Sequence, residues 1–125
     1  VHDYQLMLVP RMLRELVPGA TVGFFLHIPF PAPDLFRTLP ARDALLDGLL
    51  GADLVGFHTA SYMRNFAASV LHVLGASADV DRITWQGRVT NLGVYPMGVD
   101  ARGFERLGES PAVKTLVTDF RGGSE

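Results

Sequence analysis

Residues 21–26 read TVGFFL, an almost continuous apolar run with the length of one β-strand. Such a run is typical of a parallel strand that is covered on both faces. His27 follows it directly, and residues 29–33 then read PFPAP, with prolines at alternate positions. Because proline fixes its own backbone and pushes the preceding residue into an extended conformation, this segment predicts a stiff loop. A buried strand therefore ends in a histidine that is held beside a rigid loop.

Helix and strand patterns alternate on either side of this run. Apolar residues recur at helical spacing in three segments, which predict helices over residues 9–17, 41–50 and 60–74. Shorter apolar runs predict strands over residues 53–57 and 92–95, and Val1 reads as the end of a strand begun upstream. This alternation predicts an α/β fold built on a parallel sheet.

Local signals mark where some of these elements begin and end. Thr59 or Ser61 can cap the third helix, and Gly75 ends it. A short hairpin is expected around Gln86-Gly87. After Asp100 the chain reads as amphipathic helix that ends irregularly at residues 122–125.

Composition narrows the class of protein. The 125 residues have the length of one domain, and 48% of them are hydrophobic, which suits buried strands with covering helices. A net charge of -2 provides no basic footprint for nucleic acid or for an acidic membrane surface. The absence of cysteine excludes disulfides and thiolate chemistry and is compatible with the cytoplasm, where we expect the protein. No apolar run approaches the ~18 residues of a membrane span.

Polar residues follow two of the predicted strands. Ligands of open α/β sheets bind outside the carboxyl ends of the strands, where Asp3 and His27 are expected. Asp3 has two equally weighted interpretations, as a helix cap or as an acceptor for ligand hydroxyls. His27 is either a core histidine or a ligand contact, and the rigid proline loop favours the contact. His2 and Tyr4 flank Asp3, and His58 is a weaker candidate.

Motifs for metal and cofactor chemistry are weak or missing. Asp79-Val80-Asp81 has the form of a paired-carboxylate metal motif, but with nine aspartates in the chain one such match is close to chance. The glycine-rich dinucleotide motif, the P-loop, the zinc-protease motif and the serine-hydrolase elbow are all missing. We therefore predict neither a bound metal nor a cofactor.

Four segments together resemble the trehalose-6-phosphate synthase family, in order and in spacing. They are VHDYQL (1–6), GFFLHIPFP (23–31), DLVGFH (53–58) and VYPMGVD (94–100), and the resemblance covers about residues 1–107. It implies two Rossmann-like domains with a nucleotide-sugar site between them. On this basis residues 1–99 would be the second half of the N-terminal Rossmann-like domain. Residues 100–125 would begin the interdomain segment, truncated before the C-terminal donor-binding domain.

The resemblance also implies an activity. Members transfer glucose from UDP-glucose, a co-substrate rather than a cofactor, to glucose 6-phosphate with retention at the anomeric carbon. Asp3 and Tyr4 would bind the acceptor, and His27 would be the catalytic residue beside the transferred glucose. The partners implied are these small molecules, without nucleic acid or membrane, and a homo-oligomer is compatible with the sequence. The family's donor-site arginine and lysine would lie beyond residue 125, so we expect the isolated chain to be inactive.

Two alternatives stay open from the sequence. Glucosylglycerol-phosphate synthase is a near relative that uses glycerol 3-phosphate as its acceptor. A catalytically silent regulatory homologue would bind sugar phosphate or protein partners instead. Intact Asp3 and His27 argue against loss of catalysis.

Overall fold

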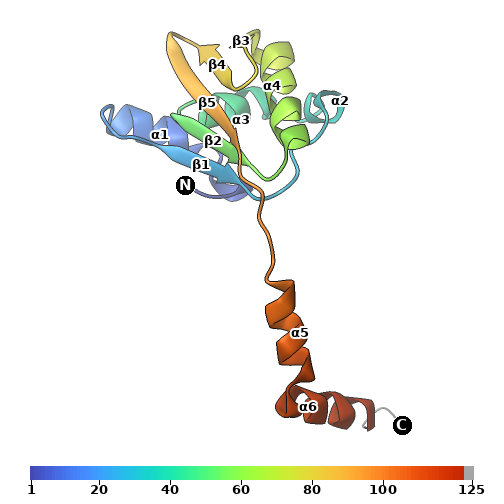
Figure 1. Ribbon diagram of the computed structural model, residues 1–125. Coiled ribbons are helices and arrows are strands. Elements are labelled where there is room, and N and C mark those ends of the chain that lie inside the picture. Colours follow the sequence, from blue (N-terminus) through green and yellow to red (C-terminus); the bar gives the residue numbers. More distant parts are fainter. Residues whose placement is uncertain (123–125) are drawn as a thin grey trace.

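The computed structural model describes residues 1–122 and is built around one five-stranded sheet (Figure 1). Its strands, in spatial order, are β1 (Gly23–Leu26), β2 (Leu54–Phe57), β5 (Arg88–Val94), β4 (Arg82–Trp85) and β3 (Ser77–Ala78). β1, β2 and β5 are parallel, whereas β4 and β3 are added in antiparallel fashion. His2 extends the sheet beyond β1 through a parallel bridge to Phe25. The three strands predicted to be parallel are therefore confirmed.

Helices precede, connect and follow these strands. They are the short 3₁₀ helix η1 (Tyr4–Leu6) and the α-helices α1 (Val9–Leu16), α2 (Pro33–Phe36), α3 (Arg42–Leu49), α4 (Ala60–Leu74), α5 (Ala101–Glu109) and α6 (Pro111–Gly122). Helices α5 and α6 project away from the sheet on an extended connection (Figure 1). Residues 123–125, part of the predicted irregular end, lie outside the described residues. Within residues 1–122, no helix is both long and apolar enough to cross a membrane.

Local signals account for most of the observed boundaries. Thr59, rather than Ser61, caps α4, since its hydroxyl oxygen accepts from the Tyr62 N–H at 3.2 Å. Gly75 ends that helix in the left-handed conformation, with φ 67°. The predicted hairpin is confirmed, with positive φ at both Gln86 and Gly87, as a type I′ turn requires. Its second arm makes β5 longer than the predicted 92–95. The proline at position 33 opens the short helix α2, which the sequence did not predict.

The hydrophobic core lies on one face of the sheet. Phe24 and Leu26 of β1, and Val55 and Phe57 of β2, are buried toward the helices. The alternate positions face the other side, where Gly23 is exposed. The expectation that residues 21–26 would be covered on both faces is therefore wrong for the described chain. Phe25, which the run places on that other face, takes part in the site described below.

The proline loop after His27 is anchored by an aromatic cluster. The Phe30 ring is buried, with its centroid 4.8 Å from that of Phe36 and 5.3 Å from that of Phe66. The side-chain amide of Asn65 donates to the Phe30 carbonyl oxygen at 3.0 Å. Packing therefore fixes the loop that follows β1, in addition to the restriction that proline imposes on its backbone.

Helices α1 and α3 approach closely enough to require glycine. A Cβ on Gly51 would overlap the backbone of Pro10 and Arg11, and a Cβ on Gly48 would lie 2.6 Å from the Met7 carbonyl oxygen. Asp47 reinforces this contact by accepting from Arg11 Nη2 at 2.8 Å and from the Trp85 indole N–H at 3.0 Å. The interface leaves no space for side chains at either glycine.

Asp53 joins three segments at the amino ends of the strands. It accepts from Arg14 Nη2 at 2.6 Å, from the Val22 N–H at 2.7 Å and from Arg88 Nη2 at 3.2 Å. Burial on its own would raise the pKa of Asp53. The Val22 hydrogen bond and the two guanidinium groups outweigh burial and hold the pKa below the ordinary value of 3.8. The charged Asp53 carboxylate therefore links α1 and β5 to the start of β2 through ion pairs.

Because the pKa of Asp53 is lowered in the folded state, the free energy of unfolding should depend on pH in the acidic range. A carboxyl whose pKa is lower in the folded state stabilises that state above its unfolded pKa, and the stabilisation disappears as pH falls through the folded pKa. We expect Asp53→Asn to unfold at lower urea concentration at neutral pH, with a deficit that shrinks as pH falls below 3.8. Asp43→Asn, on the exposed side of α3, is the control. An Asp53→Asn deficit that does not change with pH would contradict the assignment.

Candidate functional site

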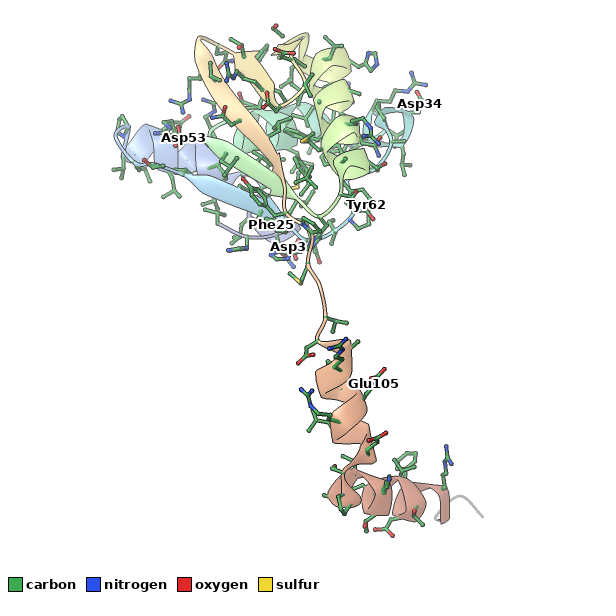
Figure 2. The ribbon with its side chains drawn as sticks, in the orientation of Figure 1. Asp3, Phe25, Asp34, Asp53, Tyr62 and Glu105 are labelled. Atoms are coloured by element: carbon green, nitrogen blue, oxygen red, sulfur yellow. The ribbon has the colours of Figure 1, made fainter. Side chains whose placement is uncertain are left out.

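Polar and aromatic side chains gather at the carboxyl ends of the parallel strands. His27 follows β1, His58 follows β2 and Tyr95 follows β5, while Asp3 lies beside the end of β1. Figure 2 shows Asp3 and Phe25 together where the chain leaves the sheet toward α5, with Asp53 well away from them. The predicted location of the candidate site, at the carboxyl edge, matches this arrangement.

Asp3 has a strained backbone. Its φ of 70° and ψ of 167° fall in a region that is essentially restricted to glycine and costs about 1–3 kcal/mol for other residues. The conformation is held by the Asp3 N–H, which donates to the Phe25 carbonyl oxygen at 2.8 Å, and by the Leu6 N–H, which donates to the Asp3 carbonyl oxygen at 3.1 Å. Strain of this kind concentrates at ligand-binding positions, which singles out Asp3.

The two oxygens of the Asp3 carboxylate differ in their hydrogen bonds. Oδ1 accepts from the Tyr4 N–H at 2.9 Å, which caps η1, and from the His27 N–H at 3.3 Å. Within residues 1–122, Oδ2 makes no hydrogen bond. The helix-cap interpretation is thus correct for one oxygen, and the other is available to a ligand.

Three histidines surround the ring of Phe25. His2 Nδ1 and His27 Nε2 lie 3.0 Å apart, at hydrogen-bonding distance. The Phe25 centroid lies 4.7 Å from that of His27 and 4.9 Å from that of His58. Among the described residues, no histidine or carboxylate cluster could hold a metal ion. The arrangement instead offers imidazole nitrogens and a carboxylate oxygen to hydroxyl groups.

Aromatic rings lie directly on glycines of the sheet. A Cβ on Gly56 would lie 2.7 Å from Phe25 Cδ2, and a Cβ on Gly93 would lie 2.5 Å from Tyr95 Cε2. Phe25, Gly56 and Gly93 are neighbours across the three parallel strands. The missing side chains allow both rings to lie close against the backbone beside the histidines.

Two of the shallow hollows that the described residues form near this edge involve His27 or Tyr4. One, of about 290 Å³, is lined by His2, Phe25, His27, Tyr95, Pro96 and Met97. Tyr4 lines the other, an apolar hollow of about 320 Å³ under the proline loop. The His27 N–H and the Asp3 carboxylate are in contact, but Asp3 lines neither of these two hollows, and Tyr4 lies at a different surface from His27.

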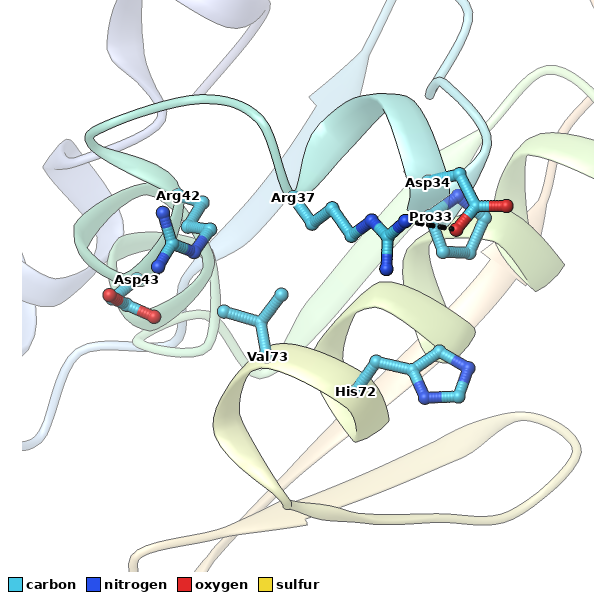
Figure 3. Close-up of a pocket in the computed structure, with 7 residues that line it drawn as sticks. All are labelled: Pro33, Asp34, Arg37, Arg42, Asp43, His72 and Val73. Carbon is cyan, nitrogen blue, oxygen red and sulfur yellow. Dashed lines mark ion pairs between the residues drawn. The ribbon is translucent and has the colours of Figure 1, made fainter.

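A larger hollow, of about 460 Å³, lies among α2, α3 and α4 (Figure 3). It presents Arg37 and Arg42 but also Asp34 and Asp43, and Arg37 pairs with Asp34 at 3.4 Å. Its acidic and basic residues balance, so no cationic site for a phosphate results. We assign it no part in the candidate site.

Residues missed by the sequence reasoning follow a simple spacing. Phe25, Gly56 and Gly93 each lie two positions before a strand-end residue, namely His27, His58 and Tyr95. Alternate residues of a strand share a face, so each pair lies on the same side of the sheet. This period of two is the signal that could have added Phe25 and Tyr95 to the candidate residues.

An open, mostly parallel α/β sheet with polar groups at its carboxyl edge has the arrangement in which ligands bind outside the ends of the strands. The model of glycosyltransferase family 20 matches residues 1–122, and the chain belongs to that family. It is 46% identical, over 98% of its length, to the UDP-forming alpha,alpha-trehalose-phosphate synthase 56 kDa subunit of Saccharomyces cerevisiae.

Solved structures give the same result. A UDP-forming synthase of this kind from Burkholderia xenovorans, in complex with glucose-6-phosphate, has a TM-score of 0.81 and 33% identity over 93% of the chain. The N-terminal domain of Candida albicans trehalose-6-phosphate phosphatase has a TM-score of 0.83 and 37% identity over 97% of the chain. The chain spans 26%, 28% and 26% of the yeast, Burkholderia and Candida proteins, respectively.

Proposed function

We propose that this chain is the acceptor-binding part of a retaining glucosyltransferase. The reaction proposed is transfer of glucose from UDP-glucose to glucose 6-phosphate, giving α,α-trehalose 6-phosphate. Family membership supports glycosyl transfer, and the name of the yeast relative supports the UDP-forming reaction. The glucose-6-phosphate complex of the Burkholderia relative supports the acceptor.

One observation carries the assignment of roles, namely the contact between Asp3 and His27 at the carboxyl edge. Asp3 Oδ1 is engaged by backbone N–H groups, so we assign Oδ2 to the acceptor's hydroxyls. His27 lies one hydrogen bond away and is assigned to the transferred glucose. Tyr4 is half exposed and lines the apolar hollow under the proline loop, so we propose that it borders the acceptor only from that side.

Positioning accounts for the chemistry that these residues would perform. In a front-face retaining transfer, the leaving diphosphate can accept the acceptor's proton, so no protein nucleophile is required. Holding both sugars in a near-attack arrangement can supply several kcal/mol of the barrier. An acceptor-side carboxylate also discriminates against analogues that lack the hydroxyls it binds.

The division of the whole protein is part of the proposal. Residues 1–99 would complete the N-terminal Rossmann-like domain, and residues 100–125 would begin the connection to a donor-binding domain. The extended segment after β5, and the projecting helices α5 and α6, are compatible with such a connection (Figure 1). The groups that bind the donor diphosphate would then come from sequence outside these residues.

Comparison of two acceptors tests the function. The complete product of the gene, sequenced beyond both ends of these residues, is incubated with UDP-glucose and either glucose 6-phosphate or glycerol 3-phosphate. We expect UDP release only with glucose 6-phosphate, and no transfer by the 125-residue chain alone. Release with glycerol 3-phosphate alone would identify the glucosylglycerol-phosphate reaction instead.

The same assay tests whether the protein is a catalytically silent homologue, an alternative that the likeness to the Candida protein makes relevant. That protein is described as a phosphatase, so likeness of fold is shared beyond proteins named as synthases. Binding of glucose 6-phosphate without UDP release from UDP-glucose would refute the proposed transfer. It would favour a regulatory role for the chain.

A further inference from the structure

We propose that His2 is a positioning residue for His27. The hydrogen bond between His2 Nδ1 and His27 Nε2 would hold the His27 ring so that its Nδ1 is directed to the substrate. The substrate in this statement rests on the proposed function, whereas the hydrogen bond between the two rings does not.

Hydrogen-bond chemistry limits what this pair can do. A neutral imidazole has one N–H donor and one lone-pair acceptor, so one ring donates and the other accepts across the 3.0 Å separation. Nε2 of His27 is thereby committed. Across the described part of the chain, Nδ1 of His27 has no hydrogen-bond partner, so it is the ring nitrogen left for a ligand.

The backbone fixes the location of His2. Its two neighbours are bound to Phe25, because the Phe25 N–H donates to the Val1 carbonyl oxygen at 3.0 Å and the Asp3 N–H donates to the Phe25 carbonyl oxygen at 2.8 Å. His2 therefore pairs with Phe25 in a parallel bridge. His27 follows Phe25 by two residues on the same face, which places its ring centroid 5.3 Å from that of His2.

The other neighbours of His27 confine its ring without distinguishing its nitrogens. Phe25 and His58 contact it through ring faces and edges, with centroids 4.7 Å and 5.5 Å away. Neither makes a hydrogen bond to His27 within residues 1–122. Since the hydrogen bond at one imidazole nitrogen sets the protonation of the other, His2 determines the tautomer of His27.

The hydrogen bond has two possible directions, and we assign the one in which His27 carries its proton on Nε2. If His27 donates from Nε2 and His2 accepts at Nδ1, both rings adopt this tautomer. The Nε2–H of His2 then faces solvent, as its exposed side chain permits. His27 is left with an unprotonated Nδ1, which can accept a hydrogen bond from a sugar hydroxyl.

The experiment uses the complete protein with ¹⁵N-labelled histidine and three substitutions. His2→Leu removes the hydrogen bond, and His2→Asn keeps an acceptor oxygen near the location of Nδ1. His72→Leu, at an exposed position of α4, is the matched control. The tautomer of His27 is read from ring ¹⁵N shifts without substrate, and kcat and KM are measured with UDP-glucose and glucose 6-phosphate.

We expect His27 to carry its proton on Nε2 in the unmodified protein and in the His72→Leu and His2→Asn variants. His2→Leu should give mixed tautomers and lower kcat by about tenfold, with KM for the acceptor little changed, because a misplaced group slows reaction more than binding. An unchanged tautomer in His2→Leu would overturn the proposal. A tautomer change in a protein that transfers no glucose would uphold the positioning and reject the proposed function.

Discussion

Asp3→Ala in the complete protein is expected to lower kcat/KM for glucose 6-phosphate by on the order of 100-fold, from loss of about two hydroxyl contacts at roughly 1–3 kcal/mol each. The KM for UDP-glucose should stay nearly constant, because the donor diphosphate is assigned to groups outside these residues. Steady-state kinetics in which each substrate is varied separately measures both effects.

The strained backbone of Asp3 supplies the controls for this substitution. Alanine loses the carboxylate and keeps the unfavourable φ of 70°, whereas Asp3→Gly loses the carboxylate and relieves the strain. Both variants should fail with the acceptor, but Asp3→Gly should have the higher thermal unfolding midpoint. Asp3→Asn keeps an oxygen for the Tyr4 and His27 N–H groups and tests the charge alone. Wild-type kinetics for the acceptor in Asp3→Gly would refute the assignment of Asp3 to acceptor binding.

Gly51→Ala is expected to destabilise the fold by about 3 kcal/mol, the upper part of the range for an overpacked interior. The new Cβ would overlap the backbone of Pro10 and Arg11, so α1 as a whole must move rather than one flexible side chain. That movement would also disturb the Arg14–Asp53 ion pair, which spans 2.6 Å. Urea unfolding followed by circular dichroism measures the change.

Gly19→Ala is the matched control, because a Cβ at that position has no atom within 4 Å. Its unfolding midpoint should equal that of the unmodified protein. Equal midpoints for the Gly51→Ala and Gly19→Ala variants would mean that α1 and α3 adapt to the added methyl group without cost.

Elements defined by local patterns were predictable from the sequence. Helix α4 combines a capping threonine, helical spacing and a terminal glycine, and its predicted bounds agree with Ala60–Leu74. Strand β5 was predicted too short because its first residues are less apolar and depend on pairing with β4. The side-by-side packing of α1 and α3 depends on contacts between distant residues, and no local pattern reveals it.

The candidate site was likewise only partly predictable from the sequence. His27 stands out because it directly follows an apolar strand, and Asp3 because it lies just after the strand end that Val1 predicts; strand ends of a parallel sheet meet at one edge. The commitment of one Asp3 oxygen to backbone N–H groups could not be predicted, since it depends on the Asp3 backbone angles. Tyr4 is adjacent to Asp3 in sequence, but η1 turns its side chain toward the apolar hollow.

The rings that lie on Gly56 and Gly93 have a consequence for how this surface can evolve. Residue 56 can enlarge only if Phe25 withdraws, and residue 93 only if Tyr95 does, because ring and added methyl group would occupy the same volume. Enlargement of residue 56 or residue 93 therefore requires a smaller or displaced ring at residue 25 or residue 95 as well. Replacements at these four positions therefore depend on one another, although the positions are separated by up to 70 residues in the chain.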